Sequence, residues 1–242
     1  MILAIETATR AGSVALAQGT EILCADSGDA SASHSTDLIQ TVERTLNAAG
    51  VKLSQVDLFA AAVGPGSFTG LRIGLATIKS FAVCTGKNCV GVSTLAAIAD
   101  AAGPAERTVS LLPAGRGELF AQLFSVADGQ VRELDTAAHL SPNALLEKYG
   151  KAPQLLWAGE GAHQRDEILR EWADSHNISF NDSGAKQNGW SLAPSTNQLA
   201  SSIAALALNA YRRGETVSPN DLQAVYVRAS DAEINEKWQR EK

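Results

Sequence analysis

The sequence predicts an α/β protein built from two successive βββαβα units. Short apolar runs of strand length alternate with longer stretches of helical periodicity, and clusters of turn residues separate them. The same order of elements begins again after Gly103-Pro104. We therefore expect a first domain at residues 1–103 and a second, more divergent domain at residues 104–242.

Three antiparallel strands are expected to open the first domain, because Gly12 and Gly19-Thr20 mark tight turns between apolar runs. The continuous apolar run at residues 58–63 is typical of a strand that is covered on both faces. Gly50 and Gly86 mark the ends of the helices before and after this strand. The predicted strands are 2–7, 13–18, 21–25, 58–63 and 88–92, and the predicted helices are 36–49, 71–85 and 94–102.

The second domain repeats this order. Ser141-Pro142 predicts a helix start, because proline suits the first helical position. Ser195 and Gln198 have the spacing of a capping box, which predicts that the longest helix begins at Ser195. The two-domain division leaves this helix free to pack back on the first domain. The predicted strands are 108–112, 118–126, 130–134, 155–158 and 224–228, and the predicted helices are 142–149, 164–175 and 195–213. Two such units in succession are characteristic of the duplicated RNase H-like fold of actin, Hsp70 and the sugar kinases (the ASKHA group).

The composition of the 242 residues is that of an ordinary soluble globular protein, with 45% hydrophobic and 19% charged residues. The net charge is −6 and the only compact basic pair in a predicted element is Arg212-Arg213, which argues against nucleic acid held by this chain alone. The N-terminus runs straight into a strand, and no apolar segment reaches the roughly 20 residues of a membrane span. Three cysteines without a paired pattern fit a reducing compartment, so we expect a cytoplasmic protein that does not contact a membrane.

Residues 63–74, Val-Gly-Pro-Gly-Ser-Phe-Thr-Gly-Leu-Arg-Ile-Gly, join a predicted strand to a predicted helix. Gly64 and Gly66 allow close backbone approaches, and Thr69 is placed to cap the helix. The segment lacks the Gly-Lys-Ser/Thr of a P-loop and the G-x-G-x-x-G of a dinucleotide fingerprint. Two interpretations stay open: a loop that is rich in glycine for packing, or an anion site at the positive end of a helix.

The sequence lacks the common metal and nucleophile patterns. No two of its four histidines have H-x-x-x-H spacing, and no Ser or Cys lies in a G-x-S-x-G context. We therefore expect no catalytic residue and no metal ligand. Glu6, at the end of an apolar strand, is either a turn residue that accepts backbone N–H groups or a remnant of a phosphate and metal position. The weak cofactor-binding candidates are Glu6, Thr7, Gly64 and Gly66.

Four segments resemble the bacterial TsaB (YeaZ) family. They are Ile2-Leu-Ala-Ile-Glu-Thr-Ala8, the glycine-rich run at 64–74, Gly91-Val-Ser-Thr-Leu95 and Ala224-Val-Tyr-Val-Arg228. The resemblance is specific over most of residues 1–100 and thins to scattered anchors beyond them. It departs from the family at residues 113–120, where Pro-Ala-Gly-Arg-Gly-Glu-Leu-Phe replaces Asp-Ala-Arg-x-Gly-Glu-Val-Tyr, and at Glu6, where Asp is usual. A polar role of these family positions therefore does not transfer to this chain.

The resemblance implies a non-catalytic scaffold that binds and activates a TsaD-type transferase, for threonylcarbamoylation of adenosine 37 in ANN-decoding tRNAs. It implies a TsaE-type ATPase as a second partner and contact with tRNA only through the complex. No cofactor is expected in the isolated chain, whereas ATP or ADP is expected at the partner interface. Where the partner is missing, a homodimer is expected. The alternatives are an active nucleotide-dependent transferase or kinase of the same superfamily, and a peptidase.

The helices predicted at residues 36–49 and 71–85 are the expected partner surface. Each turns one apolar stripe to its own sheet, which leaves Gly70 and Gly74 on a neighbouring face of the second helix. Two glycines on one helix face indicate close packing, either against a partner helix or against this chain's own sheet. The expected interface residues are Leu38, Val42, Gly70, Arg72, Ile73, Gly74, Thr77 and Phe81.

Overall fold

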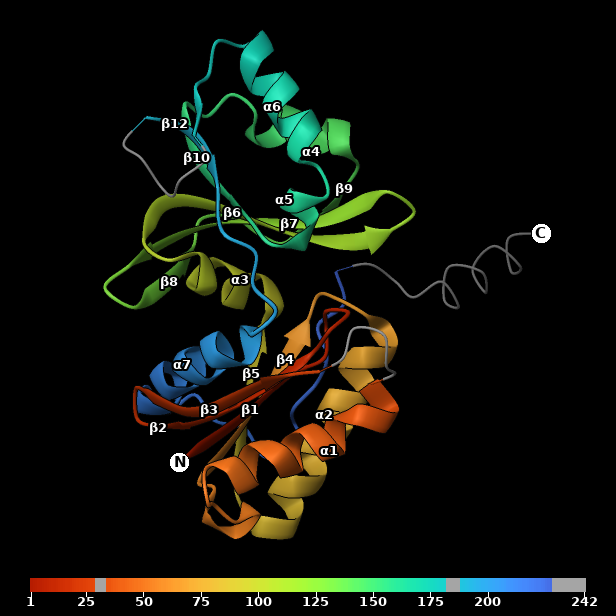
Figure 1. The fold of residues 1–242 in the computed structure, drawn as a ribbon, viewed down its shortest axis with the longest axis vertical. Helices are drawn as coiled ribbons and strands as arrows, with labels where there is room; N and C mark the ends of the chain where they lie inside the picture. The colour runs from red at the N-terminus through yellow and green to blue at the C-terminus, as the bar shows by residue number, and fades with distance from the viewer. Residues whose placement is uncertain (29–33, 182–187, 228–242) are drawn as a thin grey trace, which may run out of the picture.

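The computed structural model, which describes residues 1–28, 34–181 and 188–227, contains two mixed sheets stacked one above the other (Figure 1). The first sheet has the strand order β3-β2-β1-β4-β5. Its strands are β1 (Ile2–Glu6), β2 (Ser13–Gln18), β3 (Glu21–Ser27), β4 (Leu58–Gly64) and β5 (Asn88–Ser93). The first three strands are antiparallel, whereas β4 and β5 run parallel to β1.

The second sheet has the order β11-β12-β10-β6-β7-β8, and β9 also pairs with β7. Its strands are β6 (Ala105–Gly115), β7 (Glu118–Ala127), β8 (Gln130–Glu133), β9 (Ala138–Leu140), β10 (Gln154–Ala158), β11 (Phe180–Asn181) and β12 (Gly189–Leu192). The antiparallel β6–β7–β8 meander and the parallel β10 repeat the pattern of the first sheet. The two βββαβα units predicted from the sequence are therefore confirmed as an ASKHA-type fold.

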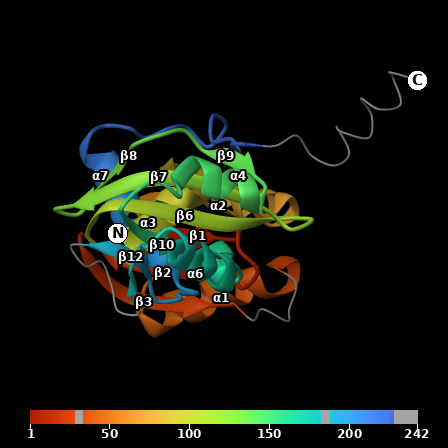
Figure 2. The same cartoon turned by 90° about the horizontal axis from the view of Figure 1, so that it is seen from above.

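Helices lie outside and between the two sheets. The outer face of the first sheet is covered by α1 (His34–Ala48) and α2 (Phe68–Thr85), and its inner face by α7 (Leu199–Arg212). The short α3 (Thr94–Ala102) packs against both α7 and the second sheet, whose outer face carries α4 (Pro142–Tyr149) and α6 (Asp166–Ser175). Figure 2 shows the second half of the molecule lying over the first.

The inner helix α7 lies close to the first sheet because its buried stripe is made of small residues. Ala200, Ala204 and Ala207 are fully buried against residues of β1, β2 and β4. The backbone N–H of Ala200 also donates to the Ser13 hydroxyl at 3.0 Å. A helix from the second half of the sequence thus completes the core of the first sheet.

After α7 the chain returns along the first sheet. Residues 215–227, which we call the C-terminal strap, make an isolated bridge between Val217 and Cys89 and bury Leu222. The Val225 N–H donates to the Val63 carbonyl at 2.7 Å. In the described part of the chain, no helix is long and apolar enough to cross a membrane.

Several predicted elements differ from the structure. The helix predicted at 164–175 corresponds to α6, which begins two residues later, at Asp166. A single turn that was not predicted, α5 (Glu160–His163), precedes it after Gly159. The helix predicted at 195–213 begins at Leu199 rather than Ser195, and Gln198 makes no side-chain cap bond there. It has 14 residues against 18 in α2, so the prediction that it is the longest helix is wrong. The strand predicted at 224–228 is irregular as far as residue 227, and residue 228 lies outside the described residues.

Candidate functional site

The turn after β1 is closed by its own side chains. The Glu6 carboxylate is fully buried and accepts the Thr9 backbone N–H at 2.7 Å and the Thr9 hydroxyl at 2.6 Å. Thr7 is also buried and donates its hydroxyl to the Gly70 carbonyl at 2.8 Å. The small cavity beside Glu6 and Thr7 has a volume of about 10 Å³, close to the least that one water needs. The turn-residue interpretation of Glu6 therefore fits the structure.

The glycine-rich loop packs against this same turn. The Ser67 N–H donates to the Ala8 carbonyl at 2.8 Å, and the Ser67 hydroxyl accepts the Gly70 N–H at 3.2 Å. Ser67, not Thr69 as predicted, is therefore the N-cap of α2. A Cβ on Gly66 would lie 2.6 Å from Ala8, and one on Gly64 would lie 2.5 Å from the Val225 carbonyl oxygen. The loop is thus glycine-rich because other parts of the chain lie close to it.

The two helix glycines have an internal explanation as well. A Cβ on Gly70 would lie 1.9 Å from the Thr7 carbonyl oxygen, and a Cβ on Gly74 would lie 2.2 Å from Thr7 Oγ1. Both glycines are buried. Their small size lets α2 approach the end of β1, so the expectation that Gly70 and Gly74 contact a partner helix is wrong.

Two other residues expected at the partner surface are also buried. Leu38 and Val42 of α1 belong to the core beneath the first sheet, with exposed fractions of 6% and 3%. Both point inward because they form the apolar stripe by which α1 packs on the sheet. Arg72 is exposed, and Ile73, Thr77 and Phe81 are half-buried, with Phe81 against Phe59.

The exposed side of α2 has little charge and several small or apolar residues. Val83 is 65% exposed, and Ile39 on the neighbouring α1 is 54% exposed. Ala76 and Ser80 are exposed between Arg72 and Val83 at helical spacing. We call Ile39, Arg72, Ala76, Ser80 and Val83 the outer helical face. No acidic side chain lies on α2, and its only charged residues are Arg72 and Lys79.

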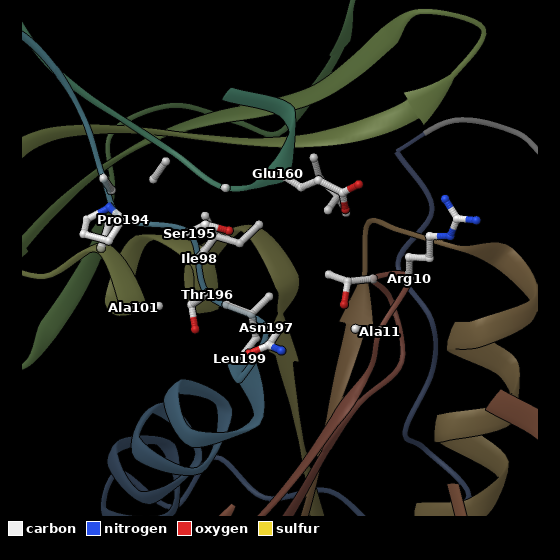
Figure 3. A pocket seen from close by; sticks show the side chains of 16 residues that line it. Arg10, Ala11, Ile98, Ala101, Glu160, Pro194, Ser195, Thr196, Asn197 and Leu199 are labelled. Atoms are coloured by element: carbon white, nitrogen blue, oxygen red, sulfur yellow. The ribbon is translucent and has the colours of Figure 1, made fainter. Parts of the chain in front are cut away.

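A second concave feature lies between the two halves of the molecule (Figure 3). This cleft has a volume of about 240 Å³, an apolar floor that includes Ile98 of α3, and a rim that includes Arg10 and Glu160. One side of it is formed by residues 193–197, which precede α7. None of the four cofactor candidates, Glu6, Thr7, Gly64 and Gly66, lines this cleft.

The cleft residues were largely missed by the sequence analysis. Ile98, Ala101 and Leu112 are apolar and look like ordinary core positions in the sequence. The one signal for this cleft in the sequence is the pair of glycines on either side of Glu160. The structure shows why the first is needed, since Gly159 has a φ of +91° and a Cβ there would lie 2.4 Å from the Leu111 carbonyl oxygen.

The segment that departs from the family pattern forms the β6–β7 turn. Gly115, Arg116 and Gly117 all have positive φ angles, between 53° and 80°. Beyond the turn, the Glu118 carboxylate lies 2.9 Å from His139 Nε2. Among the described residues, no group of three His, Cys, Asp or Glu side chains is placed to hold a metal ion.

Comparison with known proteins identifies similar chains. The family described as TsaD, tRNA N6-adenosine threonylcarbamoyltransferase, matches residues 28–229. The tRNA threonylcarbamoyladenosine biosynthesis protein TsaB of Escherichia coli is 28% identical over 237 residues, which cover 94% of each chain. A crystal structure from Pseudomonas aeruginosa, described as similar to peptidase YeaZ, has a TM-score of 0.77 at 28% identity and covers 94% of this chain and 99% of its own. The activator of 2-hydroxyisocaproyl-CoA dehydratase from Clostridium difficile has a TM-score of 0.51 at 9% identity, covers 93% of this chain and 99% of its own, and shares the fold.

Proposed function

The chain belongs to the TsaB (YeaZ) family of tRNA threonylcarbamoyladenosine biosynthesis proteins, and from this we propose that it is a non-catalytic subunit of that modification. In this proposal it binds a TsaD-type transferase and is required for threonylcarbamoylation of adenosine 37 in ANN-decoding tRNAs. The outer helical face is the docking surface.

The observation that supports docking is the chemistry of that face. Val83 and Ile39 are each more than half exposed, and small residues lie between Arg72 and Val83. A helix face that stays in water usually presents Lys, Glu or Gln. Small and apolar side chains instead allow a helix of another protein to lie close, and the apolar surface of both proteins is then removed from water.

The support for a non-catalytic role comes from the first hairpin. Both Glu6 carboxylate oxygens accept hydrogen bonds from Thr9, and Thr7 is bonded to Gly70. In this arrangement the polar groups nearest the glycine-rich loop hold the protein's own turn. The proposal therefore assigns the catalytic chemistry to the transferase, and a TsaE-type ATPase is the second partner. The complex, rather than this chain alone, holds tRNA, and ATP or ADP binds at the interface. We propose that the complex works in the cytoplasm.

The test is a reconstituted modification assay with purified TsaD-type and TsaE-type proteins, threonylcarbamoyl-adenylate and tRNA. Modified tRNA should form only when this chain is added, and Val83→Asp should abolish both modification and co-purification with the transferase. Tyr211→Asp, on an exposed residue of α7, is the matched control and should change neither. Full modification without this chain would refute the scaffold role.

The cleft keeps the kinase or transferase alternative testable. Calorimetry with ATP on the isolated chain should show no tight binding. Micromolar affinity together with turnover would favour an active enzyme of the same superfamily.

Without the partner, the same outer helical face is expected to pair two copies of this chain. Val83→Asp should then keep the protein monomeric at all concentrations.

A further inference from the structure

The start of α2 carries an exposed cluster of one cation and two aromatic rings. The guanidinium carbon of Arg72 lies 3.8 Å from the centre of the Phe68 ring. The Phe68 ring lies 5.3 Å from the ring of Tyr226 in the C-terminal strap. Arg72 Nε also makes a long hydrogen bond of 3.5 Å to the Tyr226 hydroxyl. Three side chains from two distant parts of the sequence thus form one surface feature.

This cluster holds an arginine that forms no ion pair with an acidic residue within the described part of the chain. Arg72 is exposed, and no carboxylate among the described residues forms an ion pair with it. Exposed arginines usually sample many rotamers, and ordering one costs conformational entropy. Stacking on Phe68 and contact with Tyr226 order the Arg72 side chain before a ligand binds, so less conformational entropy is lost on binding. The outer edge of the guanidinium stays available to a planar anion.

We propose that Arg72, held by Phe68 and Tyr226, binds a carboxylate side chain of the docked transferase, so that the C-terminal strap is part of the docking surface. This proposal rests on the proposed function. Two further observations support it: Val225 and Tyr226 in the strap are 54% and 45% exposed, and the Val225 N–H holds the strap to the end of β4. Large exposed apolar side chains thus continue from the outer helical face onto the strap.

A single carboxylate fits this cluster better than a phosphate chain does. A guanidinium binds one carboxylate through two parallel hydrogen bonds. A nucleotide phosphate at a helix start also uses free backbone N–H groups. Here the Ser67 N–H is bonded to the Ala8 carbonyl, the Gly70 N–H to the Ser67 hydroxyl and the Leu71 N–H to the Ser67 carbonyl. Three backbone donors at this helix start therefore serve the chain itself.

The experiment measures the dissociation constant between this chain and the purified TsaD-type transferase by calorimetry, with and without ATP. Arg72→Gln should weaken binding by about tenfold or more, as expected for the loss of one partner of an interfacial charge pair. Arg72→Lys should recover only part of the affinity, because an ammonium lacks the planar fork. Tyr226→Ala should weaken binding more in the wild-type background than in Arg72→Gln, since the part of its effect that acts through Arg72 is then already lost.

Controls separate this proposal from its premise. Arg212→Gln removes the same charge at the end of α7 and should leave the dissociation constant unchanged. If the transferase does not bind the wild-type chain, the proposed function itself fails. If Val83→Asp abolishes binding but Arg72→Gln does not weaken it, only the role of Arg72 is wrong. An Arg72 effect that appears only with ATP would assign the anion to a nucleotide phosphate and overturn the carboxylate.

Discussion

Thr7 shows how single residues join the hairpin to the helix that follows the glycine-rich loop. Its hydroxyl donates to the Gly70 carbonyl, and its carbonyl and hydroxyl oxygens occupy the space where Cβ atoms on Gly70 and Gly74 would lie. The glycine motif can be recognised in the sequence alone, but the contact that requires glycine at these positions can be identified only in the structure. Glycine spacing on a helix shows that something lies close, whereas only the structure identifies the neighbour as Thr7.

Substitutions at the two glycines test this packing. Alanine normally stabilises a helix by about 1 kcal/mol relative to glycine, so any loss of stability must come from the clash. We expect Gly70→Ala to lower the free energy of unfolding by roughly 1–3 kcal/mol, and Gly74→Ala to have a smaller effect, since Thr7 Oγ1 can rotate while a carbonyl cannot. Thermal unfolding of the isolated chain measures both. Ala76→Leu on the exposed side of α2 is the control, and equal melting temperatures for all three would contradict the internal contact.

At the scale of elements, the sequence predicts most strands and helices because buried runs and caps are local signals. The strand β4, the β6–β7–β8 meander and the helix α4 lie where the pattern places them, whereas α2 begins three residues before its predicted start. Short strands such as β9 and β12 were missed because three or four residues carry no usable periodicity. The run at 224–227 resembles a strand in composition, yet in the described residues its one backbone bond to β4 is that of Val225.

The same limit applies to the candidate site. On α2 the buried face carries Gly70, Leu71 and Gly74 and the exposed face carries Ala76, Ser80 and Val83, so both faces are small or apolar. Periodicity distinguishes a polar face from an apolar one, but it does not distinguish two faces of similar chemistry. The helices α1 and α2 therefore stay a predicted partner surface. Half of the eight residues assigned to it are buried in this chain, namely Leu38, Val42, Gly70 and Gly74.

Cysteine reactivity tests which face of α2 is available. Cys84 is exposed at the C-terminal end of this helix, next to Val83, whereas Cys89 in β5 is buried. Burial raises the pKa of the Cys89 thiol to about 11, so at pH 8 almost none of it is the reactive thiolate. Iodoacetamide followed by mass spectrometry should modify Cys84 well before Cys89. Bound transferase should slow the modification of Cys84, and unchanged labelling in a confirmed complex would place the interface elsewhere.

At the scale of the whole molecule, the two halves of the sequence do not build two independent cores. The helix α7 comes from the second half but covers the inner face of the first sheet, while α3 comes from the first half and packs against the second sheet. A direct bond also joins the two halves of the sequence, from the Ala200 N–H of α7 to the Ser13 hydroxyl of β2 at 3.0 Å. On its other side, α7 is bonded to the β7–β8 turn, from the Asn209 amide to the Gly129 carbonyl at 3.0 Å. The two sheets therefore share a central helical layer.

That shared layer makes a specific prediction about fragments. Residues 1–103 alone lack α7, so Ile2, Ala4 and Leu58, which are buried beneath it, would face water. Exposing one face of a sheet costs about 25 cal/mol for each Å² of apolar area, which is large against a typical total stability of 5–15 kcal/mol. We expect this fragment to be unfolded or aggregated by circular dichroism and gel filtration, and the full chain to melt in one cooperative calorimetric transition. The control is the 1–103 fragment mixed with residues 195–227, which should regain helical signal by restoring α7. A soluble, cooperatively folded 1–103 fragment would show that the inner face of the first sheet is stable without α7.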